Sequence, residues 1–213
     1  SFLQIRSLFR VTLETEPGLL HYYAVQTFAG LRPTEAAGLP LPAPGADFLR
    51  VNAERAKTRS ARATPILPPL LLALSLLPCE RPTVPYDTAR ERRLRRILRE
   101  QGVPMTPDIL RHTYATYRFP LVGEGELSRD MGNSPAVVFR HYRGVVTRPE
   151  AEEFLTINPL QDFTPKAEEA YRIRGVLRKL RIRKKRPGKL VEPLLVRRFI
   201  PRERDASLPP PGA

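Results

Sequence analysis

The sequence of 213 residues predicts a mainly α-helical protein with one small antiparallel β-hairpin. Apolar residues recur at helical spacing along much of the first three quarters of the chain. Two short segments, residues 48–51 and 61–66, are typical of strands instead, and they flank the charged segment 52–60. We therefore expect these two strands to pair as a hairpin with a basic tip. Hydrophobic residues make up 41% of the chain, which is enough for a buried core.

Three helices are expected before the hairpin. Residues 1–15 place apolar side chains on one face and predict an amphipathic helix. Residues 19–30 predict a second, mostly buried helix that ends at its final glycine. A short third helix is expected from Pro33, because proline is favoured at the first helical position and Glu35 lies in the first turn. A loop rich in proline and glycine, residues 39–46, then leads to the hairpin.

More helices are expected after the hairpin. Residues 67–77 predict one, residues 78–87 predict a proline-rich loop, and residues 88–101 predict an arginine-rich helix. Phe119 and Pro120 are expected to interrupt the helical pattern that follows. The remaining expected helices cover residues 107–117, 124–132, 135–143 and 149–156.

The composition changes after Asn158, which predicts a folded domain of residues 1–158 and a basic, proline-rich tail of residues 159–213. Residues 171–213 hold 14 Lys and Arg against 3 Asp and Glu. The preceding 170 residues hold 22 against 19. We expect the tail to be weakly structured, with one basic helix around residues 166–182. A basic tail binds any polyanion, so the function must be argued from the domain.

Several function classes are disfavoured by the composition. Cys79 is the single cysteine, which excludes an internal disulfide and favours a reducing compartment. The longest apolar stretch, residues 66–78, is broken by prolines and is too short to span a membrane. We therefore expect a cytoplasmic protein without a membrane partner. No metal or nucleotide cofactor is expected, because no phosphate loop is present and no zinc-like spacing links Cys79 to the histidines, which are His21, His112 and His141.

Four short segments hold cationic side chains and, in the last, a tyrosine: FAGLRPTE (28–35), AKTRSAR (56–62), TPDILRHTYAT (106–116) and MGNSPAVVFRHYRGVV (131–146). In their order, spacing and expected secondary structure, these segments resemble the motifs of tyrosine recombinases of the phage-integrase type. The resemblance covers roughly residues 1–158. It implies the catalytic-domain fold of that family, a mainly helical DNA breaking and rejoining domain with a small sheet.

The resemblance implies that Arg32 and Arg111 bind the scissile phosphate, Lys57 protonates the departing 5′ oxygen, and Tyr142 is the nucleophile. These residue types suit the chemistry. Arginine donates two parallel hydrogen bonds to phosphate oxygens and stays charged. A tyrosine hydroxyl has an ordinary pKa of about 10, so it needs a cationic setting and a proton acceptor. Attack would give a 3′-phosphotyrosyl intermediate.

Other residues are expected to assist. The resemblance implies supporting catalytic roles for Asp108 and Asn133. Basic residues beside the motifs are expected to contact DNA, and they are Arg55, Arg59, Arg62, Arg140, His141 and Arg143. Double-stranded DNA and further copies of the chain, in a tetrameric synaptic complex, are the expected partners.

The sequence departs from the family pattern at several points. Asp108 stands where the family commonly has histidine, and Asn133 stands where it has histidine or tryptophan. The stretch between Arg111 and Asn133 is one residue shorter than usual. The separate N-terminal DNA-binding domain of the family is not part of the sequence.

Each of these residues also has an ordinary structural interpretation. Arg32 can simply pair with Glu35, and Lys57 can be a solvated hairpin charge. His112 is more simply a hydrogen-bonded helix residue than a catalytic group. A single tyrosine such as Tyr142 is usually a packing residue. The joint pattern, rather than any one residue, favours the recombinase.

Three hypotheses about function follow. The first is site-specific DNA recombination, by integration or excision, through metal-independent strand cleavage and rejoining in the bacterial cytoplasm at the nucleoid. The second is a catalytically degenerate integrase relic that only binds DNA. The third is a basic RNA-associated protein whose tail does the binding.

Overall fold

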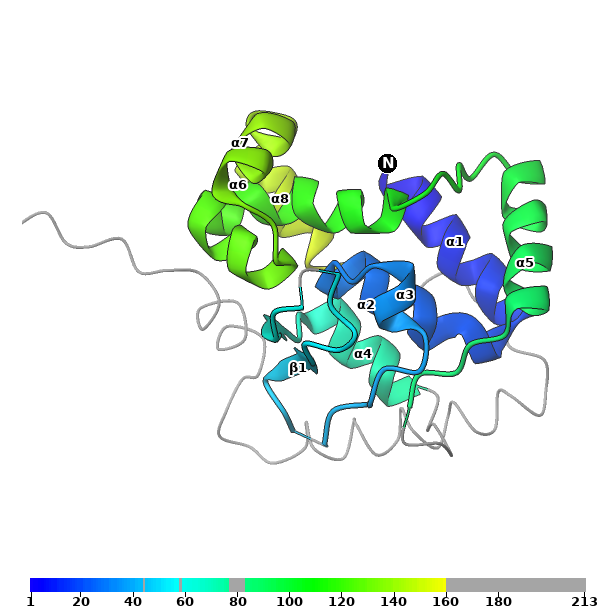
Figure 1. The fold of residues 1–213 in the computed structure, drawn as a ribbon. Helices are drawn as coiled ribbons and strands as arrows, with labels where there is room; N and C mark the ends of the chain where they lie inside the picture. Colours follow the sequence, from blue (N-terminus) through cyan, green and yellow to red (C-terminus); the bar gives the residue numbers. More distant parts are fainter. Residues whose placement is uncertain (44, 58, 77–82, 160–213) are drawn as a thin grey trace, which may run out of the picture.

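The computed structural model describes residues 1–43, 45–57, 59–76 and 83–159. Within these ranges the chain is mainly helical with one two-stranded antiparallel sheet, which confirms the coarse fold class (Figure 1). The basic helix expected around residues 166–182 lies outside the described residues.

The first helices form the centre of the fold. Helix α1 (Phe2–Thr15) is followed by a 3-10 turn (Pro17–Leu19), α2 (Leu20–Ala29) and α3 (Pro33–Ala36), as the sequence predicted. Every residue of α2 is buried, so this helix lies inside the molecule rather than on its surface. It ends at Gly30, whose φ of 65° is a left-handed conformation that glycine adopts without strain.

The hairpin joins β1 (Phe48–Val51) to β2 (Arg62–Pro65), with Phe48 opposite Pro65 and Val51 opposite Arg62. This confirms the predicted hairpin, whose connecting loop holds Lys57. The sheet is fixed to the helices from its inner face. There the buried hydroxyl of Thr64 donates a hydrogen bond of 3.1 Å to the carbonyl oxygen of Ala29, at the end of α2. Helix α4 (Pro68–Leu76) follows and packs on α2.

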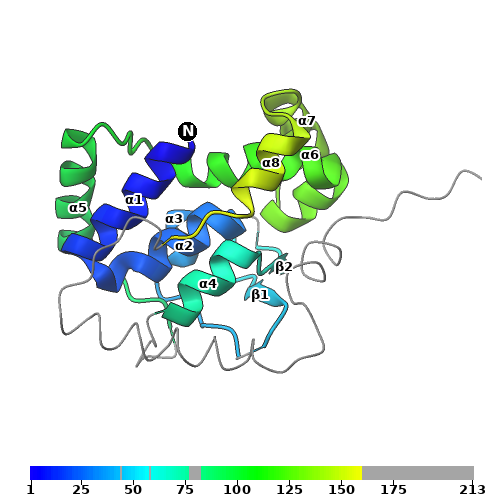
Figure 2. The ribbon, with the colours of Figure 1, turned by 180° about the vertical axis from the view of Figure 1, so that it is seen from behind.

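The arginine-rich helix α5 (Thr88–Glu100) lies at one end of the molecule, and α7 (Pro135–Tyr142) lies at the other (Figures 1 and 2). Helix α5 begins at Asp87, whose carboxylate accepts the backbone N–H of Arg90. Its inner side contacts α1. That side is narrow, and its buried residues are Glu91, Leu94 and Leu98.

The long helix α6 (Ile109–Met131) corrects one prediction. The expected interruption between two helical segments is present, but its predicted position at Phe119 and Pro120 is wrong, because both of these residues continue the first segment. The backbone instead leaves helical geometry at Gly123, where φ is 73° and ψ is −175°. Only glycine adopts this conformation readily, so the kink in α6 falls at Gly123.

Helix α8 (Arg148–Phe154) returns the chain to the core. The ring of Phe154 contacts Phe28 of α2 and stacks on Tyr117 of α6, with centroid separations of 5.4 and 4.8 Å. A second, smaller cluster of buried residues joins α6 to α7 and includes Tyr114, Val138 and Tyr142. No helix in the described part of the chain has both the length and the apolar character needed to cross a membrane.

Candidate active site

Glu35 is the centre of a cluster of three arginines. Its carboxylate is fully buried and accepts two hydrogen bonds from the guanidinium of Arg62, at 2.6 and 3.1 Å. It also pairs with the guanidinium of Arg32 at 3.1 Å, and a nitrogen of the Arg111 guanidinium lies 3.8 Å away. One carboxylate against three guanidiniums leaves the cluster with a positive charge, which suits an anionic ligand.

Local sequence explains why Glu35 points inward. Pro33 begins α3, and Glu35 occupies the third position of that helix. From there its carboxylate accepts the backbone N–H of Arg32 at 2.8 Å, which fixes the side chain against the helix N-terminus. The carboxylate is thus held by the turn that carries Arg32.

Arg111 is buried and held by backbone carbonyl groups. Its guanidinium donates to the carbonyl oxygen of Gly30 at 2.5 Å and to that of Met131 at 2.7 Å. These bonds join the end of α2, the first turn of α6 and the end of α6 at one point. The side chain therefore has a fixed position before any ligand binds.

Arg32 and Arg111 converge on one oxygen atom. Each donates a hydrogen bond of 3.1 Å to the side-chain oxygen of Asn133, which follows the end of α6. The motifs at residues 28–35, 106–116 and 131–146 thus meet in space. We name Arg32, Arg111 and Asn133, with Glu35 beneath them, the arginine clamp.

The electrostatics of the clamp keep Glu35 and Arg111 charged. Burial would raise the pKa of Glu35, but hydrogen bonds from Arg62 and from the Arg32 backbone, with the charges of Arg62 and Arg111, hold it below its ordinary value. Burial, aided by the charge of Arg32, lowers the pKa of Arg111 to about 10. Arg111 therefore remains protonated at neutral pH.

Tyr142 ends α7 and is buried, with 5% of its surface exposed. Its hydroxyl oxygen lies 2.7 Å from Nδ1 of His112 on α6. Burial raises the pKa of this hydroxyl, the charge of Arg111 acts in the opposite direction, and the charge of Asp108 raises it further. The tyrosine is therefore neutral at neutral pH and lies within the electrostatic reach of the arginine clamp.

Two of the predicted catalytic residues, Asp108 and Lys57, are outside the hydrogen-bonded contacts described above. Asp108 comes immediately before α6, half-buried and with a φ of 57°, and its carboxylate acts on Tyr142 through charge. Lys57 is exposed in the hairpin loop. Within the described residues, the structure brings Arg32, Arg111 and Asn133 into direct contact but does not bring Lys57 to them.

The residues expected to contact DNA occupy two regions. Arg55 and Arg59 are exposed in the hairpin loop, and Arg140, His141 and Arg143 are exposed at the end of α7. Arg62 differs from these. Its guanidinium is held by Glu35 and donates a third bond, of 3.0 Å, to the carbonyl oxygen of Asp130. The structure thus places Arg62 beneath the arginine clamp instead of on the surface.

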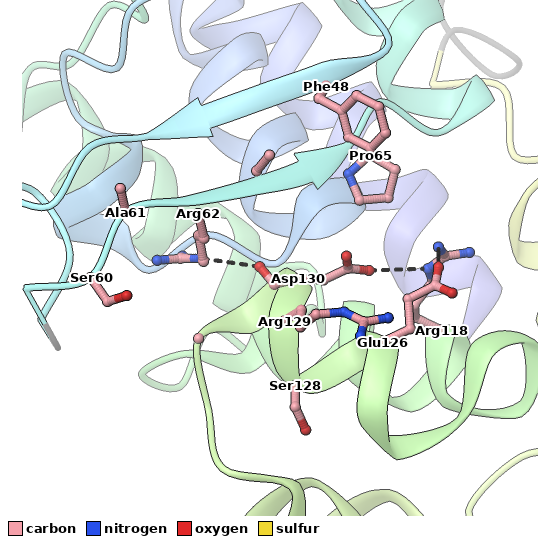
Figure 3. A pocket seen from close by; sticks show the side chains of 12 residues that line it. Phe48, Ser60, Ala61, Arg62, Pro65, Arg118, Glu126, Ser128, Arg129 and Asp130 are labelled. Atoms are coloured by element: carbon pink, nitrogen blue, oxygen red, sulfur yellow. Dashed lines mark hydrogen bonds and ion pairs between the residues drawn. The ribbon is translucent and has the colours of Figure 1, made fainter.

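A hollow of about 720 Å³ lies between the hairpin and the end of α6 (Figure 3). Arg62 lines it from the sheet, and Asp130 and Arg118 line it from α6. The carboxylate of Asp130 accepts hydrogen bonds from the hydroxyl of Tyr114 at 2.8 Å and from Arg118 at 3.4 Å. Arg62 therefore contacts both regions: it is bonded to Glu35 of the arginine clamp, and it lines this hollow beside Asp130.

Sequence reasoning missed the contact between His112 and Tyr142 and the position of Arg62. His112 directly follows Arg111, and this adjacency was the only available signal. The burial of Arg62 had a signal in the alternation of β2, where Arg62 and Thr64 share one face. Among the described residues, no His, Cys, Asp and Glu side chains gather in a group that could hold a metal ion.

Comparison with known proteins found no matching family model, no matching curated protein and no matching solved structure.

Proposed function

We propose that this chain contains the catalytic domain of a tyrosine-type site-specific DNA recombinase, with the catalytic-domain fold of that family. The observation that carries the proposal is the convergence of Arg32 and Arg111 on one oxygen atom, that of Asn133. Two guanidiniums that meet at one oxygen are arranged as they would be around an oxygen of a phosphate diester. The substrate of the proposed reaction is duplex DNA.

The charge balance of the clamp supports an anionic ligand. Glu35 neutralises part of the positive charge and keeps the arginines in place, while Asn133 supplies only a neutral amide oxygen. A phosphate oxygen carries more negative charge than this amide oxygen, so it would compete for the same donors. The fixed position of Arg111 removes much of the cost of ordering the site when the ligand binds.

Tyr142 supplies the nucleophile in the proposed reaction. Its hydroxyl oxygen attacks the phosphorus atom, and the bond from phosphorus to the 5′ oxygen breaks. The DNA strand is then joined to Tyr142 through its 3′ phosphate. Lys57, on the exposed hairpin loop, would protonate the departing 5′ oxygen once DNA draws this loop to the cut. Rejoining reverses each step, and a tetramer of chains on DNA would exchange the strands in the cytoplasm.

A second candidate function rests on the oxygen of Asn133, which already occupies the point where the arginines converge. If this amide is not displaced, the chain is a DNA-binding relic without turnover. Both candidates predict binding of DNA, but only the recombinase predicts covalent capture.

The test uses nicked duplexes from the genomic neighbourhood of the gene, which trap a covalent intermediate because the cut strand loses its short end. We expect a protein–DNA adduct that survives denaturation, and we expect Tyr142→Phe to abolish it. Tyr86→Phe is the matched control, because Tyr86 is exposed, and it should form the adduct at the normal rate. DNA binding without any adduct on such substrates would favour the relic, and an adduct that persists in Tyr142→Phe would exclude Tyr142 as the nucleophile.

A further inference from the structure

We propose, resting on the proposed recombinase function, that His112 is a further catalytic residue, which takes the proton from the Tyr142 hydroxyl during cleavage and returns it during rejoining. His112 is not among the residues to which the resemblance to tyrosine recombinases gives a catalytic role. The inference comes from its contact with the reacting oxygen atom.

The geometry suits a proton transfer. Nδ1 of His112 lies 2.7 Å from the Tyr142 hydroxyl oxygen, which is a short hydrogen-bond distance for these two groups. The two ring centroids are 5.8 Å apart with the rings tilted by 44°, so the contact is made at the ring edge and not by stacking. Nδ1 can accept the hydroxyl proton in the tautomer that carries its own proton on Nε2.

Because of its environment, Tyr142 needs a proton acceptor before its hydroxyl oxygen can attack phosphorus. Since burial raises the pKa of its hydroxyl, the oxygen keeps its proton at neutral pH and is a weak nucleophile until that proton leaves. Histidine is the side chain that most readily exchanges a proton near neutral pH. His112 is itself exposed, so a proton received at the imidazole can pass on to water.

The position of His112 also links the acceptor to the phosphate site. His112 and Arg111 are consecutive residues of α6, with Arg111 buried in the arginine clamp and His112 against Tyr142. One rigid helical turn therefore sets the distance between the group that binds phosphate and the group that activates the nucleophile. Such fixed positioning is what an in-line attack requires.

The proposed steps balance. In cleavage the oxygen–phosphorus bond to Tyr142 forms, its proton moves to His112 Nδ1, and the 5′ oxygen leaves with a proton from Lys57. In rejoining the 5′ hydroxyl attacks the same phosphorus and gives its proton to Lys57. The Tyr142 oxygen then leaves and recovers its proton from His112.

His141 is the matched control for this proposal. It is the neighbour of Tyr142 in sequence and is also exposed, but its ring centroid lies 6.3 Å from that of the tyrosine at a tilt of 58°. In the described part of the chain, the hydrogen bond of the Tyr142 hydroxyl is made with His112. If the loss of any imidazole near the site were enough to slow the reaction, His112→Ala and His141→Ala would be slowed alike.

The experiment measures the single-turnover rate of adduct formation by the full chain. His112→Ala and His112→Asn should both reduce this rate by about 10²- to 10⁴-fold, which is the usual contribution of a general base. His141→Ala is compared at saturating DNA, because His141 is itself an expected DNA contact, and there it should reduce the rate much less than either His112 variant. Asparagine can hydrogen-bond the hydroxyl but cannot take its proton, so a near-normal rate in His112→Asn would show that His112 only positions Tyr142 and would overturn the proposal.

A second substrate separates the two proton transfers. Sulfur in place of the bridging 5′ oxygen gives a leaving group that needs no proton, so the defect of Lys57→Ala should disappear while the defect of His112→Ala remains. Recovery of His112→Ala on this substrate would assign His112 to the leaving group and overturn the proposal. An adduct in the parent chain with no loss in His112→Ala would overturn it as well, whereas the absence of any adduct in the parent chain would contradict the proposed function itself.

Discussion

Glu35 determines the stability of the arginine clamp at the scale of single residues. Its buried carboxylate lies among the guanidiniums of Arg32, Arg62 and Arg111. Without this negative charge the three cations would repel one another in a region with little water. The same carboxylate fixes the directions of the Arg32 and Arg62 guanidiniums by hydrogen bonds, so the stability of the fold and the geometry of the site both depend on this side chain.

Glu35→Gln should therefore reduce the free energy of unfolding at neutral pH by about 3–5 kcal/mol, as expected when one partner of a buried ion pair is removed. The pKa of Glu35 is lower in the folded state than its ordinary value of 4.5, so its stabilisation is complete above that value and is lost as the pH falls through the folded pKa. Denaturant unfolding of both chains, from about pH 7 to about pH 3, checks this difference. Equal stability of the two chains at neutral pH would contradict it.

At the scale of elements, the bend in α6 at Gly123 sets the relative positions of the site residues. The first part of this helix carries Arg111 and His112, and the part after Gly123 leads to Asn133 and then to Tyr142 on α7. The direction of the second part sets where Asn133 and Tyr142 meet the residues of the first part. The backbone at Gly123 is therefore part of the site geometry, although a Cβ added there would meet no atom within 4 Å.

Gly123→Ala should destabilise the fold by about 1–3 kcal/mol, because an alanine at a φ of 73° and a ψ of −175° is strained. It should also slow adduct formation, since a displacement of about 1 Å in the second part of α6 can cost two orders of magnitude in rate. The control is Gly125→Ala, two residues away in the same helix, where an added Cβ meets no atom within 4 Å and the φ is not positive. That substitution should be neutral or stabilising in denaturant unfolding. Equal destabilisation by the two substitutions would show that the bend is not strained.

Secondary structure was largely predictable from the sequence, and the contacts between elements were not. The hairpin at residues 48–51 and 61–66 followed from local pattern, as did the end of α2 at Gly30. The break expected at Phe119 and Pro120 lies at Gly123 instead, because the backbone conformation of the kink is one that only glycine adopts readily. The contact of His112 with Tyr142 depends on how α7 packs against α6, which no local pattern encodes.

The same distinction applies to the candidate site. The motifs that contain Arg32, Arg111 and Asn133 meet in space, and their joint role as one catalytic site stays a prediction. Arg62 was expected on the DNA surface because it stands in a basic segment, but the first residue of β2 faces Glu35. Charge along a sequence does not show which member of a basic cluster has a buried acidic partner.

The distribution of charge becomes important at the scale of the whole molecule. The last 43 residues, 171–213, hold 14 Lys and Arg against 3 Asp and Glu, so much of the excess positive charge is in the tail. If the chain binds DNA as proposed, a tail of this composition would add binding that does not depend on DNA sequence and weakens steeply with salt. The arginine clamp would make few phosphate contacts by comparison, but these are the contacts that would position the reaction.

Deletion of residues 160–213 should therefore lower the affinity for duplex DNA at low salt and reduce the slope of log affinity against log salt. The binding that remains should weaken further in Arg32→Ala and in Arg111→Ala. Fluorescence anisotropy with labelled duplexes over a salt series measures both effects, with circular dichroism to check that each variant is folded. If the shortened chain binds DNA no less tightly with both arginines replaced, the tail alone carries the binding and the basic RNA-associated protein becomes the better hypothesis.

The central claim is that Tyr142 forms a bond to the 3′ phosphate of a cut DNA strand beside the arginine clamp. Peptide mass spectrometry of the isolated protein–DNA adduct, after digestion of both polymers, tests this claim most directly. We predict a single modified peptide that spans residues 141–143, with a nucleotide attached to Tyr142 through its 3′ phosphate. Attachment to another residue, or through a 5′ phosphate, would contradict the account.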